Sequence, residues 1–241
     1  MKRALDGKAA LVTGASRGIG RAIAERLHAD GATIMPVARA SEDFTDLIDK
    51  LGERCIPWSG DASSDELLAW IEGRSQINIL VNNVGTNVPK PMAEVEDEVL
   101  DRMIDLNIRT TYRVSRHATA RMANGGRVIN ITSQMGHVGS PGRTVYCMTK
   151  HAMEGLTKAM AVELAPRGIR VNSVAPTFVE TPMTAPMLAD PDFRDFVNRM
   201  IPLGQTAKPE DVAAAVAYLA GPGGAMVTGT SLLVDGGWTA Q

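Results

Sequence analysis

The sequence predicts an α/β fold in which a doubly wound parallel sheet of about seven strands carries helices on both faces. Three observations support this prediction. Short apolar runs alternate with helical patterns along the chain, a glycine-rich turn joins the first strand to the first helix, and no linker, repeat or low-complexity tract interrupts the alternation. Parallel neighbours need a crossover connection, usually a helix, so this alternation indicates a parallel sheet. With 241 residues, we expect one domain over residues 1–241.

Composition and charge restrict the classes of function. Hydrophobic residues make up 44% of the chain and charged residues 22%, which is ordinary for a soluble globular protein. The net charge of −2 gives no reason to expect a nucleic acid or an anionic membrane as a partner. No apolar run approaches the roughly eighteen residues of a membrane span, and the basic N-terminus lacks the apolar core of a secretory signal. Two cysteines make no disulfide framework, so we expect a cytoplasmic protein.

The first strand is predicted at residues 9–12, and it runs into the turn Thr13-Gly14-Ala15-Ser16-Arg17-Gly18-Ile19-Gly20. A helix follows, because Ile19, Ile23 and Leu27 recur on one face. The glycine spacing is Gly-x-x-x-Gly-x-Gly rather than the commoner GxGxxG. Glycines between a strand and a helix let the backbone approach a pyrophosphate, which then lies on the helix N-terminus. This context predicts a dinucleotide cofactor and a Rossmann-type sheet.

The end of the second strand indicates which dinucleotide. It lies about twenty residues past the glycines, where an acidic residue would hold the ribose 2′-hydroxyl of NAD. The residues there are Ala38 and Arg39. An arginine suits a 2′-phosphate, and Arg17 in the glycine turn could be a second basic partner, so we expect NADP(H) in preference to NAD(H). The alternative is a pair of solvated surface arginines, beside the acidic residues Glu42 and Asp43.

The remaining elements continue the alternation. Strands are predicted at residues 32–38, 55–58, 77–81, 127–131, 169–174 and 230–234, and helices at 42–51, from 65 onward, 96–122, 144–164 and from 209 onward. Pro36 falls within the second strand, where its missing N–H predicts an irregular ladder. Residues 177–205 are rich in proline and methionine and too long for a simple loop, so we expect a partly helical lid over a site.

Polar residues follow several of the predicted strands. Asp61 could accept a hydrogen bond from an adenine amine, or it could simply shape its turn. Asn82 and Asn83 favour a turn and can bond the backbone of neighbouring strands. Asn107 lies among apolar residues inside a predicted helix, where asparagine is disfavoured, so it is either a satisfied core amide or a functional one. The four histidines form no ligand cluster, and no metal is expected.

Tyr146 and Lys150 lie four residues apart in the run after Thr144, so in a helix they share one face. A cation beside a phenol favours the phenolate and lowers its pKa from about 10. Such a tyrosine can exchange a proton with a carbonyl or hydroxyl group. Ser133 follows the fifth strand and could face the same atom. The alternative is an ordinary amphipathic helix with a surface lysine.

Several motifs occur together along the chain: Thr13-Gly14-Ala15-Ser16-Arg17-Gly18-Ile19-Gly20, Asn82-Asn83-Val84-Gly85, Asn107, Ser133, Tyr146-x-x-x-Lys150, and Pro176 before Thr181. In this order the whole chain resembles the short-chain dehydrogenase/reductase family. It is similar to the 3-oxoacyl-carrier-protein reductases, and the basic pair Arg17 and Arg39 matches the NADP-preferring branch. Two residues depart from the family pattern near the nicotinamide: Val84 stands where alanine is frequent, and Thr177 where glycine is frequent.

The resemblance implies a role for each of four residues. Tyr146 is then the general acid in reduction and the general base in oxidation. Lys150 lowers the pKa of Tyr146 and binds the nicotinamide ribose. Ser133 hydrogen-bonds and polarises the substrate oxygen, and Asn107 positions a water that connects Lys150 to solvent.

The resemblance also implies the contacts to the cofactor. Asp61 matches an adenine-contacting aspartate, Asn83 a ribose contact, and both Val179 and Thr181 match positions that hold the nicotinamide carboxamide. The implied cofactor-binding residues are Gly14, Ser16, Arg17, Gly18, Ile19, Gly20, Arg39, Asp61, Ala62, Asn83, Gly85, Tyr146, Lys150, Pro176, Val179 and Thr181.

We therefore expect an NADP(H)-dependent oxidoreductase that interconverts a ketone or aldehyde with a secondary alcohol. The substrate would be a small carbonyl compound, a sugar or polyol, or a 3-oxoacyl group. The chain has no obvious basic cluster for an acidic carrier protein, which favours a free small molecule. Residues expected to select the substrate are Thr86, Asn87, Gln134, His137, Cys147, Met183, Met187 and Trp238. The alternative is a non-catalytic dinucleotide-binding sensor or scaffold, and the family resemblance implies a homotetramer.

Overall fold

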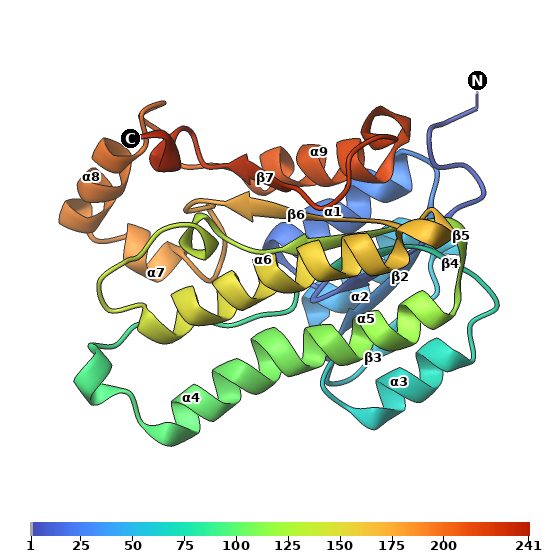
Figure 1. Cartoon of the computed structure of the whole chain (residues 1–241), viewed down its shortest axis with the longest axis horizontal. Helices are drawn as coiled ribbons and strands as arrows, with labels where there is room; N and C mark the ends of the chain where they lie inside the picture. The colour runs from blue at the N-terminus through green and yellow to red at the C-terminus, as the bar shows by residue number, and fades with distance from the viewer. Residues whose placement is uncertain (1) are drawn as a thin grey trace.

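A computed structural model describes residues 2–241 and contains a seven-stranded sheet, all of whose strands are parallel (Figure 1). The strands are β1 Ala9–Thr13, β2 Thr33–Ala38, β3 Trp58–Ser59, β4 Ile77–Asn82, β5 Met122–Ile131, β6 Arg170–Pro176 and β7 Ser231–Val234. Their order is β3-β2-β1-β4-β5-β6-β7. From β1, successive strands are added first on one side (β2, β3) and then on the other (β4 to β7), so the strand order reverses between β1 and β4. Ligands of such folds bind at that point, beyond the carboxyl ends of the strands.

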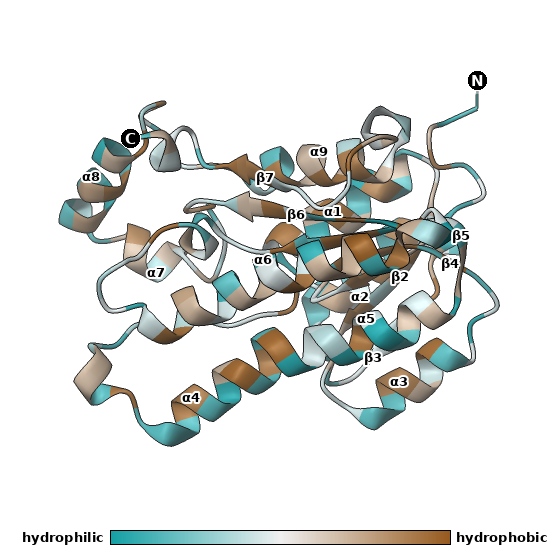
Figure 2. Cartoon of the chain, viewed as in Figure 1, coloured by the Kyte–Doolittle hydropathy of each residue, from teal (hydrophilic) through white to brown (hydrophobic). Residues whose placement is uncertain are grey.

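Helices cover both faces of the sheet, which confirms the predicted fold class. They are α1 Gly18–Ala29, α2 Glu42–Leu51, α3 Asp65–Glu72, α4 Asp97–Ile104, α5 Thr110–Ala120, α6 Thr144–Leu164, α7 Ala185–Leu188, α8 Pro191–Met200 and α9 Pro209–Ala220. Helices α1, α2 and α9 pack on one face together with Val12, while α3, α5 and α6 pack on the other with Leu11. Successive residues of β1 thus enter opposite cores, and Figure 2 shows the hydrophobic colours gathered on the strands.

The long helix predicted at residues 96–122 is interrupted and ends earlier than expected. A π-helical turn, Asp105–Arg109, lies between α4 and α5, and Asn107 is at its centre. The predicted end was wrong, because α5 stops at Ala120 and Met122 already pairs with Ile77 in the sheet. The register of β5 then shifts before it becomes regular, so its first residues carry no clear strand pattern.

The expectation of an irregular ladder at Pro36 was also wrong. The pairing of β2 with β1 continues through Pro36 without a shift in register. The carbonyl groups of Ile34 and Ala38 accept hydrogen bonds from the β3 side, and Pro36 has the same orientation in the strand. Its missing N–H therefore faces β3, which is only two residues long, and no bond to β1 is lost.

Residues 177–205 contain α7 and α8 and lie beyond the carboxyl ends of β6 and β7, at the left of Figure 1. They pack through an aromatic group: the ring centroids of Phe178 and Phe193 are 5.5 Å apart, and those of Phe178 and Trp238 are 5.8 Å apart. The same apolar cluster contacts Tyr146. Over residues 2–241, no helix combines the length and the apolar character needed to cross a membrane.

Candidate active site

The glycine-rich turn forms a close junction between β1 and α1. Gly14 and Gly18 have positive φ angles of 66° and 55°, which glycine adopts without strain. A Cβ atom on Gly20 would lie 2.2 Å from the carbonyl oxygen of Gly14, so only glycine allows this packing. Among the described residues, no side chain caps the N-terminus of α1 and no acidic residue lies in its first turn. The free N–H groups and the helix dipole suit a pyrophosphate, so the turn fits the dinucleotide expected there.

Asn83 ties the end of β4 to this turn. Its side-chain amide donates to the carbonyl oxygens of Thr13 and Gly14, at 3.0 and 3.1 Å. Its backbone N–H donates to the Thr13 hydroxyl at 3.0 Å. The neighbouring Asn82 side chain donates to Asn130 on β5 at 2.8 Å. These bonds confirm that the asparagine pair links neighbouring strands, and they fix the point where the strand order reverses.

The predicted cofactor-binding residues lie in a row along the carboxyl ends of the strands. Gly14, Ser16, Arg17, Gly18, Ile19 and Gly20 follow β1, Arg39 follows β2, Asp61 and Ala62 follow β3, Asn83 and Gly85 follow β4, Tyr146 and Lys150 lie on α6, Pro176 ends β6, and Val179 and Thr181 come after it. Arg39 and Asp61 are at the β2–β3 end of this row, away from Tyr146. A row of this kind suits an extended ligand such as a dinucleotide.

Two exposed arginines lie in the row, Arg17 after β1 and Arg39 after β2. Neither Arg17 nor Arg39 forms an ion pair with any residue from 2 to 241. Asp61 accepts hydrogen bonds at its Oδ1 atom from the backbone N–H and hydroxyl of Ser63, at 2.9 and 2.7 Å. The Ser63 bonds and the charge of Arg39 lower the pKa of Asp61. Asp61 therefore shapes its turn, and the adenine contact stays a prediction.

Ser133, Tyr146 and Lys150 converge where β5 meets α6. The Lys150 ammonium is 5.5 Å from the centre of the Tyr146 ring and donates to the carbonyl oxygen of Ile131 at 2.9 Å. Lys150 is buried, with 6% of its surface exposed, so it is not the surface lysine of the alternative interpretation. A side-chain hydrogen bond between Ser133 and the Tyr146 phenol acts to lower the pKa of Tyr146. The structure thus places the Ser133 side chain and the Lys150 ammonium beside Tyr146.

The pKa of Tyr146 is shifted in the direction opposite to the one expected. Burial against the apolar cluster raises it to about 12, although the Ser133 hydrogen bond and the Arg143 charge act to lower it. Burial also lowers the pKa of Lys150 to about 8, opposed by the carboxylate of Glu154. The predicted lowering of the phenol pKa was therefore wrong in its net direction. A phenol with this pKa is protonated at neutral pH and ready to donate.

Asn107 is held at the π-helical turn by three hydrogen bonds. Its amide oxygen accepts from the Thr86 N–H at 2.8 Å, and its amide nitrogen donates to the Thr86 carbonyl at 2.9 Å and the Thr149 hydroxyl at 3.1 Å. A Cβ atom on Gly85 would lie 3.2 Å from the Asn107 oxygen and 3.8 Å from the Lys150 ammonium. Asn107 is thus a satisfied core amide beside Lys150, and its place in a proton relay stays a prediction. Single π turns often occur at functional sites.

The two departures from the family pattern are accommodated in the fold. Val84 packs against the core on the α3 face of the sheet. Thr177 requires no left-handed backbone, since no non-glycine residue from 2 to 241 has a positive φ angle. Its hydroxyl is buried, with no hydrogen-bond partner within that range. Thr181 covers the glycine turn, because a Cβ atom on Gly18 would lie 3.3 Å from it.

Sequence reasoning missed several residues that support the site. Glu154 is the most notable, because it is a carboxylate with only 6% of its surface exposed. It accepts hydrogen bonds from Thr132, Ser173 and Ser231, at 2.5, 2.7 and 3.1 Å, and its carboxylate lies 3.4 Å from the His137 ring. An acidic residue four positions after Lys150, on the same helix face, was the available signal. No group of three or more potential metal ligands occurs in the part of the chain that the structure describes.

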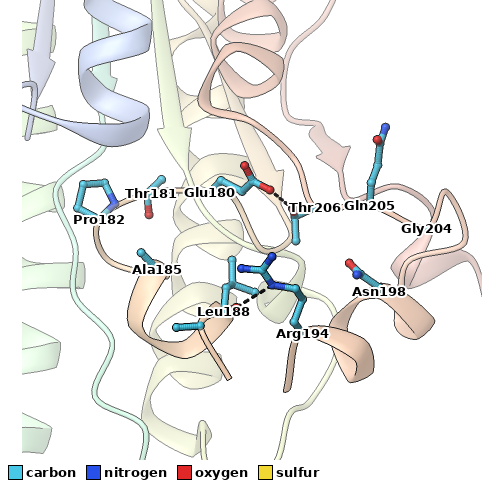
Figure 3. Close-up of a pocket in the computed structure, with 11 residues that line it drawn as sticks. Glu180, Thr181, Pro182, Ala185, Leu188, Arg194, Asn198, Gly204, Gln205 and Thr206 are labelled. Carbon is cyan, nitrogen blue, oxygen red and sulfur yellow. Dashed lines mark hydrogen bonds between the residues drawn. The ribbon is translucent and has the colours of Figure 1, made fainter. Parts of the chain in front are cut away.

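A cavity of about 550 Å³ lies within residues 180–206 (Figure 3). Its lining includes Thr181, Glu180 and Arg194; the Thr206 hydroxyl donates to Glu180 at 2.7 Å, and Arg194 donates to the Leu188 carbonyl at 2.8 Å. Thr181 is the one predicted site residue among those that line it. The cavity is therefore beside the row of predicted cofactor-binding residues rather than at Tyr146.

Comparison with known proteins agrees with this arrangement. A family model for short-chain dehydrogenases/reductases, described as enoyl-(acyl carrier protein) reductase, matches residues 14–239. The chain belongs to the short-chain dehydrogenase/reductase family. As a member of this family, it is an enzyme, a dinucleotide-dependent oxidoreductase that acts on carbonyl and hydroxyl groups.

Individual relatives of this short-chain dehydrogenase/reductase cover nearly its whole length. L-xylulose reductase of Bos taurus is 37% identical and covers 98% of each chain. The 3-oxoacyl-[acyl-carrier-protein] reductase FabG of Vibrio harveyi is 38% identical over 97% of this chain and 98% of its own. A solved structure from Beutenbergia cavernae, provisionally assigned as an NAD(P)-dependent gluconate 5-dehydrogenase and holding NADP at low occupancy, has a TM-score of 0.92, 33% identity and full coverage of both chains. All three are named as oxidoreductases, so the alternative of a non-catalytic sensor is set aside.

Proposed function

We propose that the protein is an NADP(H)-dependent reductase and dehydrogenase in which Tyr146 exchanges the proton with the substrate oxygen. The convergence of Ser133, Tyr146 and Lys150 beside the row of cofactor-binding residues carries this proposal. The bound nicotinamide supplies or accepts the hydride. In reduction, Tyr146 donates its proton to the carbonyl oxygen while the Ser133 hydroxyl hydrogen-bonds the same oxygen. In oxidation, the phenolate takes the proton of the alcohol.

Lys150 and Asn107 support that proton transfer. The ammonium of Lys150 stabilises the phenolate that remains after Tyr146 has donated, and it binds the nicotinamide ribose. Its distance of 5.5 Å from the phenol ring supports this role. Asn107 is fixed beside Lys150 and would position the water that returns a proton to the pair. The segment 177–205 acts as the lid, since its apolar cluster packs against Tyr146.

The preference for NADP(H) rests on Arg17 and Arg39. Both guanidinium groups are exposed and have no acidic partner among residues 2–241, so both can bind the 2′-phosphate. The substrate that we propose is a free sugar, polyol or sugar acid. Two of the relatives are named for such compounds, L-xylulose and gluconate. Small carbonyl compounds and 3-oxoacyl groups are the further candidates, the latter named in the FabG relative.

The test is consumption of NADPH with a panel of ketoses, simple ketones and a 3-oxoacyl thioester. We expect Tyr146→Phe to lower kcat by about 10²- to 10⁴-fold, the usual contribution of a general acid. Tyr218→Phe is the matched control, because Tyr218 is exposed on α9 and lies outside the site. Turnover that survives unchanged in Tyr146→Phe would refute the assignment.

We also propose a cytoplasmic homotetramer. Apolar side chains are exposed on the neighbouring helices α5 and α6, namely Tyr112, Met148 and Val162, and Val162 is 79% exposed. Such side chains on adjacent helices favour packing against further copies of the chain. Cys55 and Cys147 are free thiols, which suits a reducing compartment. Light scattering coupled to gel filtration tests the tetramer, and a monomeric mass would contradict it.

A further inference from the structure

We propose that Arg143 binds the carboxylate of the substrate, so that the preferred substrates are polyhydroxylated carboxylic acids rather than neutral sugars. The inference rests on the proposed function, because it places the carboxylate in the same ternary site. It depends on where the guanidinium lies, on which of its donors are used, and on two unpaired polar groups in the segments that follow β4 and β5.

Arg143 lies between α6, the helix that carries Tyr146, and the proposed lid, residues 177–205. It is the residue before α6, three positions ahead of Tyr146, and its carbonyl accepts the first helical bond from Cys147 at 2.8 Å. Its side chain reaches Met187, at 3.4 Å from the sulfur. Its charge is close enough to Tyr146 to lower the pKa of that phenol. In Figure 1 the N-terminal end of α6 accordingly lies beside α7. A substrate at Tyr146 is therefore within reach of the guanidinium.

The donors of Arg143 are almost unused. Within residues 2–241, its guanidinium makes no ion pair and bonds only a thioether, a weak acceptor, and the Gly142 carbonyl at a long 3.5 Å. The side chain is half-buried, and burial lowers its pKa, so its charge has lost part of its hydration. Two other half-buried arginines, Arg167 and Arg170, each donate to two backbone carbonyls, whereas Arg127 donates only to the Gly125 carbonyl. Arg143 differs from all three in its position, because its free donors lie beside Tyr146 and Met187 at the proposed substrate site.

The chemistry of that partner follows from the guanidinium and its surroundings. A planar fork of N–H donors matches a carboxylate through two parallel hydrogen bonds. Two buried polar atoms on the same side of the fold lack a partner in the described chain: the amide nitrogen of Gln134, which follows Ser133, and the amide oxygen of Asn87, which follows Thr86. One is a donor and the other an acceptor, which is what the hydroxyl groups of a polyol require. A carboxylate together with hydroxyl groups is the pattern of a sugar acid.

Gluconate and glucitol test the inference, because they differ only in a carboxylate where the second compound has a hydroxymethyl group. We would measure NADP⁺ reduction with each compound, and the binding of each by calorimetry to the NADP⁺-saturated protein, for wild type, Arg143→Gln, Arg143→Lys and Arg121→Gln. Arg121 is an exposed arginine just before β5, outside the site and the lid, and serves as the matched control. Thermal unfolding checks that all variants fold.

We expect wild type to prefer gluconate, and Arg143→Gln to weaken gluconate binding about ten- to hundredfold, with a rise in KM, while glucitol changes less than about threefold. Arg143→Lys should recover part of the loss, because it keeps the charge without the planar fork. If Arg143→Gln weakened the binding of both compounds equally, or did not weaken gluconate binding, the inference would be overturned. Turnover of either compound by wild type would still support the proposed function. If neither compound is turned over but gluconate binding still falls only in Arg143→Gln, the carboxylate site stands and the assigned chemistry fails.

Discussion

Lys150 and Glu154 place a buried ammonium and a buried carboxylate one helical turn apart on α6 without joining them in an ion pair among the described residues. Lys150 donates instead to the Ile131 carbonyl, and Glu154 accepts from hydroxyl groups on the neighbouring strands, including that of Ser173. Even without contact, the carboxylate raises the pKa of Lys150 against the effect of burial. Glu154 thus helps to keep the lysine beside Tyr146 charged at neutral pH.

We predict that Glu154→Gln moves the basic limb of the pH profile of kcat/KM to lower pH. The pKa of Lys150 is already lowered to about 8 by burial, and removing the carboxylate lowers it further. Lys150 loses its charge as the pH rises through its pKa, so a lower pKa means that the charged form is lost at lower pH. Glutamine keeps the side-chain shape and one acceptor oxygen for the surrounding hydroxyl groups.

The matched control is Glu163→Gln, since Glu163 is exposed on the same helix and should leave the profile unchanged. His137 and Lys150 are the titratable groups that face Glu154, from the turn after β5 and from α6 itself. The variant His137→Gln separates an effect of Glu154 on His137 from its effect on Lys150. If the basic limb reports Lys150, it should stay in place in this variant. An unshifted basic limb in Glu154→Gln would show that Lys150 does not depend on this carboxylate.

We predict that Arg39→Ser lowers kcat/KM with NADPH by about ten- to hundredfold, because a charge-assisted hydrogen bond contributes about 1.5–3 kcal/mol. The value with NADH should change little, since NADH lacks the 2′-phosphate. Initial rates with both cofactors measure the ratio. Arg121→Ser is the control, because Arg121 is exposed just before β5, at the amino ends of the strands, whereas Arg39 follows the carboxyl end of β2. A wild-type preference for NADH of tenfold or more, or an equal loss with both cofactors, would contradict the assignment of Arg39.

The parts of the site that could be predicted from the sequence depend on short-range geometry. The turn from Thr13 to Gly20 could be predicted because its shape depends on its own glycines. Gly14 and Gly18 take positive φ angles, and Gly20 packs against the turn. Tyr146 and Lys150 meet because four residues make about one helical turn. Alternation of apolar runs and helical patterns was sufficient for the parallel sheet.

The parts that could not be predicted depend on residues far apart in the chain. The pKa of Tyr146 is raised because Phe178 and its neighbours, more than thirty positions later, bury the phenol. The amide of Asn107 is satisfied by Thr149, which is 42 positions away. Pro36 fits a regular ladder because its ring happens to face the short strand β3. Local patterns carry no information about which surface a side chain meets after folding.

We predict that Gly20→Ala destabilises the fold and weakens cofactor binding together. A Cβ atom at this position would lie 2.2 Å from the Gly14 oxygen and 2.5 Å from the Asn83 amide, so the turn must open and the bonds from Asn83 to the turn are lost. Overpacking of this kind costs about 1–3 kcal/mol in the free energy of unfolding. Denaturant unfolding measures that loss, and fluorescence titration with NADPH measures the binding.

The matched control for Gly20→Ala is Gly155→Ala. Gly155 lies inside α6, and within the protomer a Cβ atom there would meet no atom within 4 Å beyond its chain neighbours and the nearby backbone of its own helix. Alanine in a helical position that is open in the protomer should raise the free energy of unfolding of the protomer by about 0.5–1 kcal/mol and leave NADPH binding unchanged. The two substitutions add the same methyl group and are expected to act in opposite directions. If Gly20→Ala were as stable as wild type and bound NADPH equally well, the close approach of Gly14 and Gly20 would not be what shapes the phosphate site.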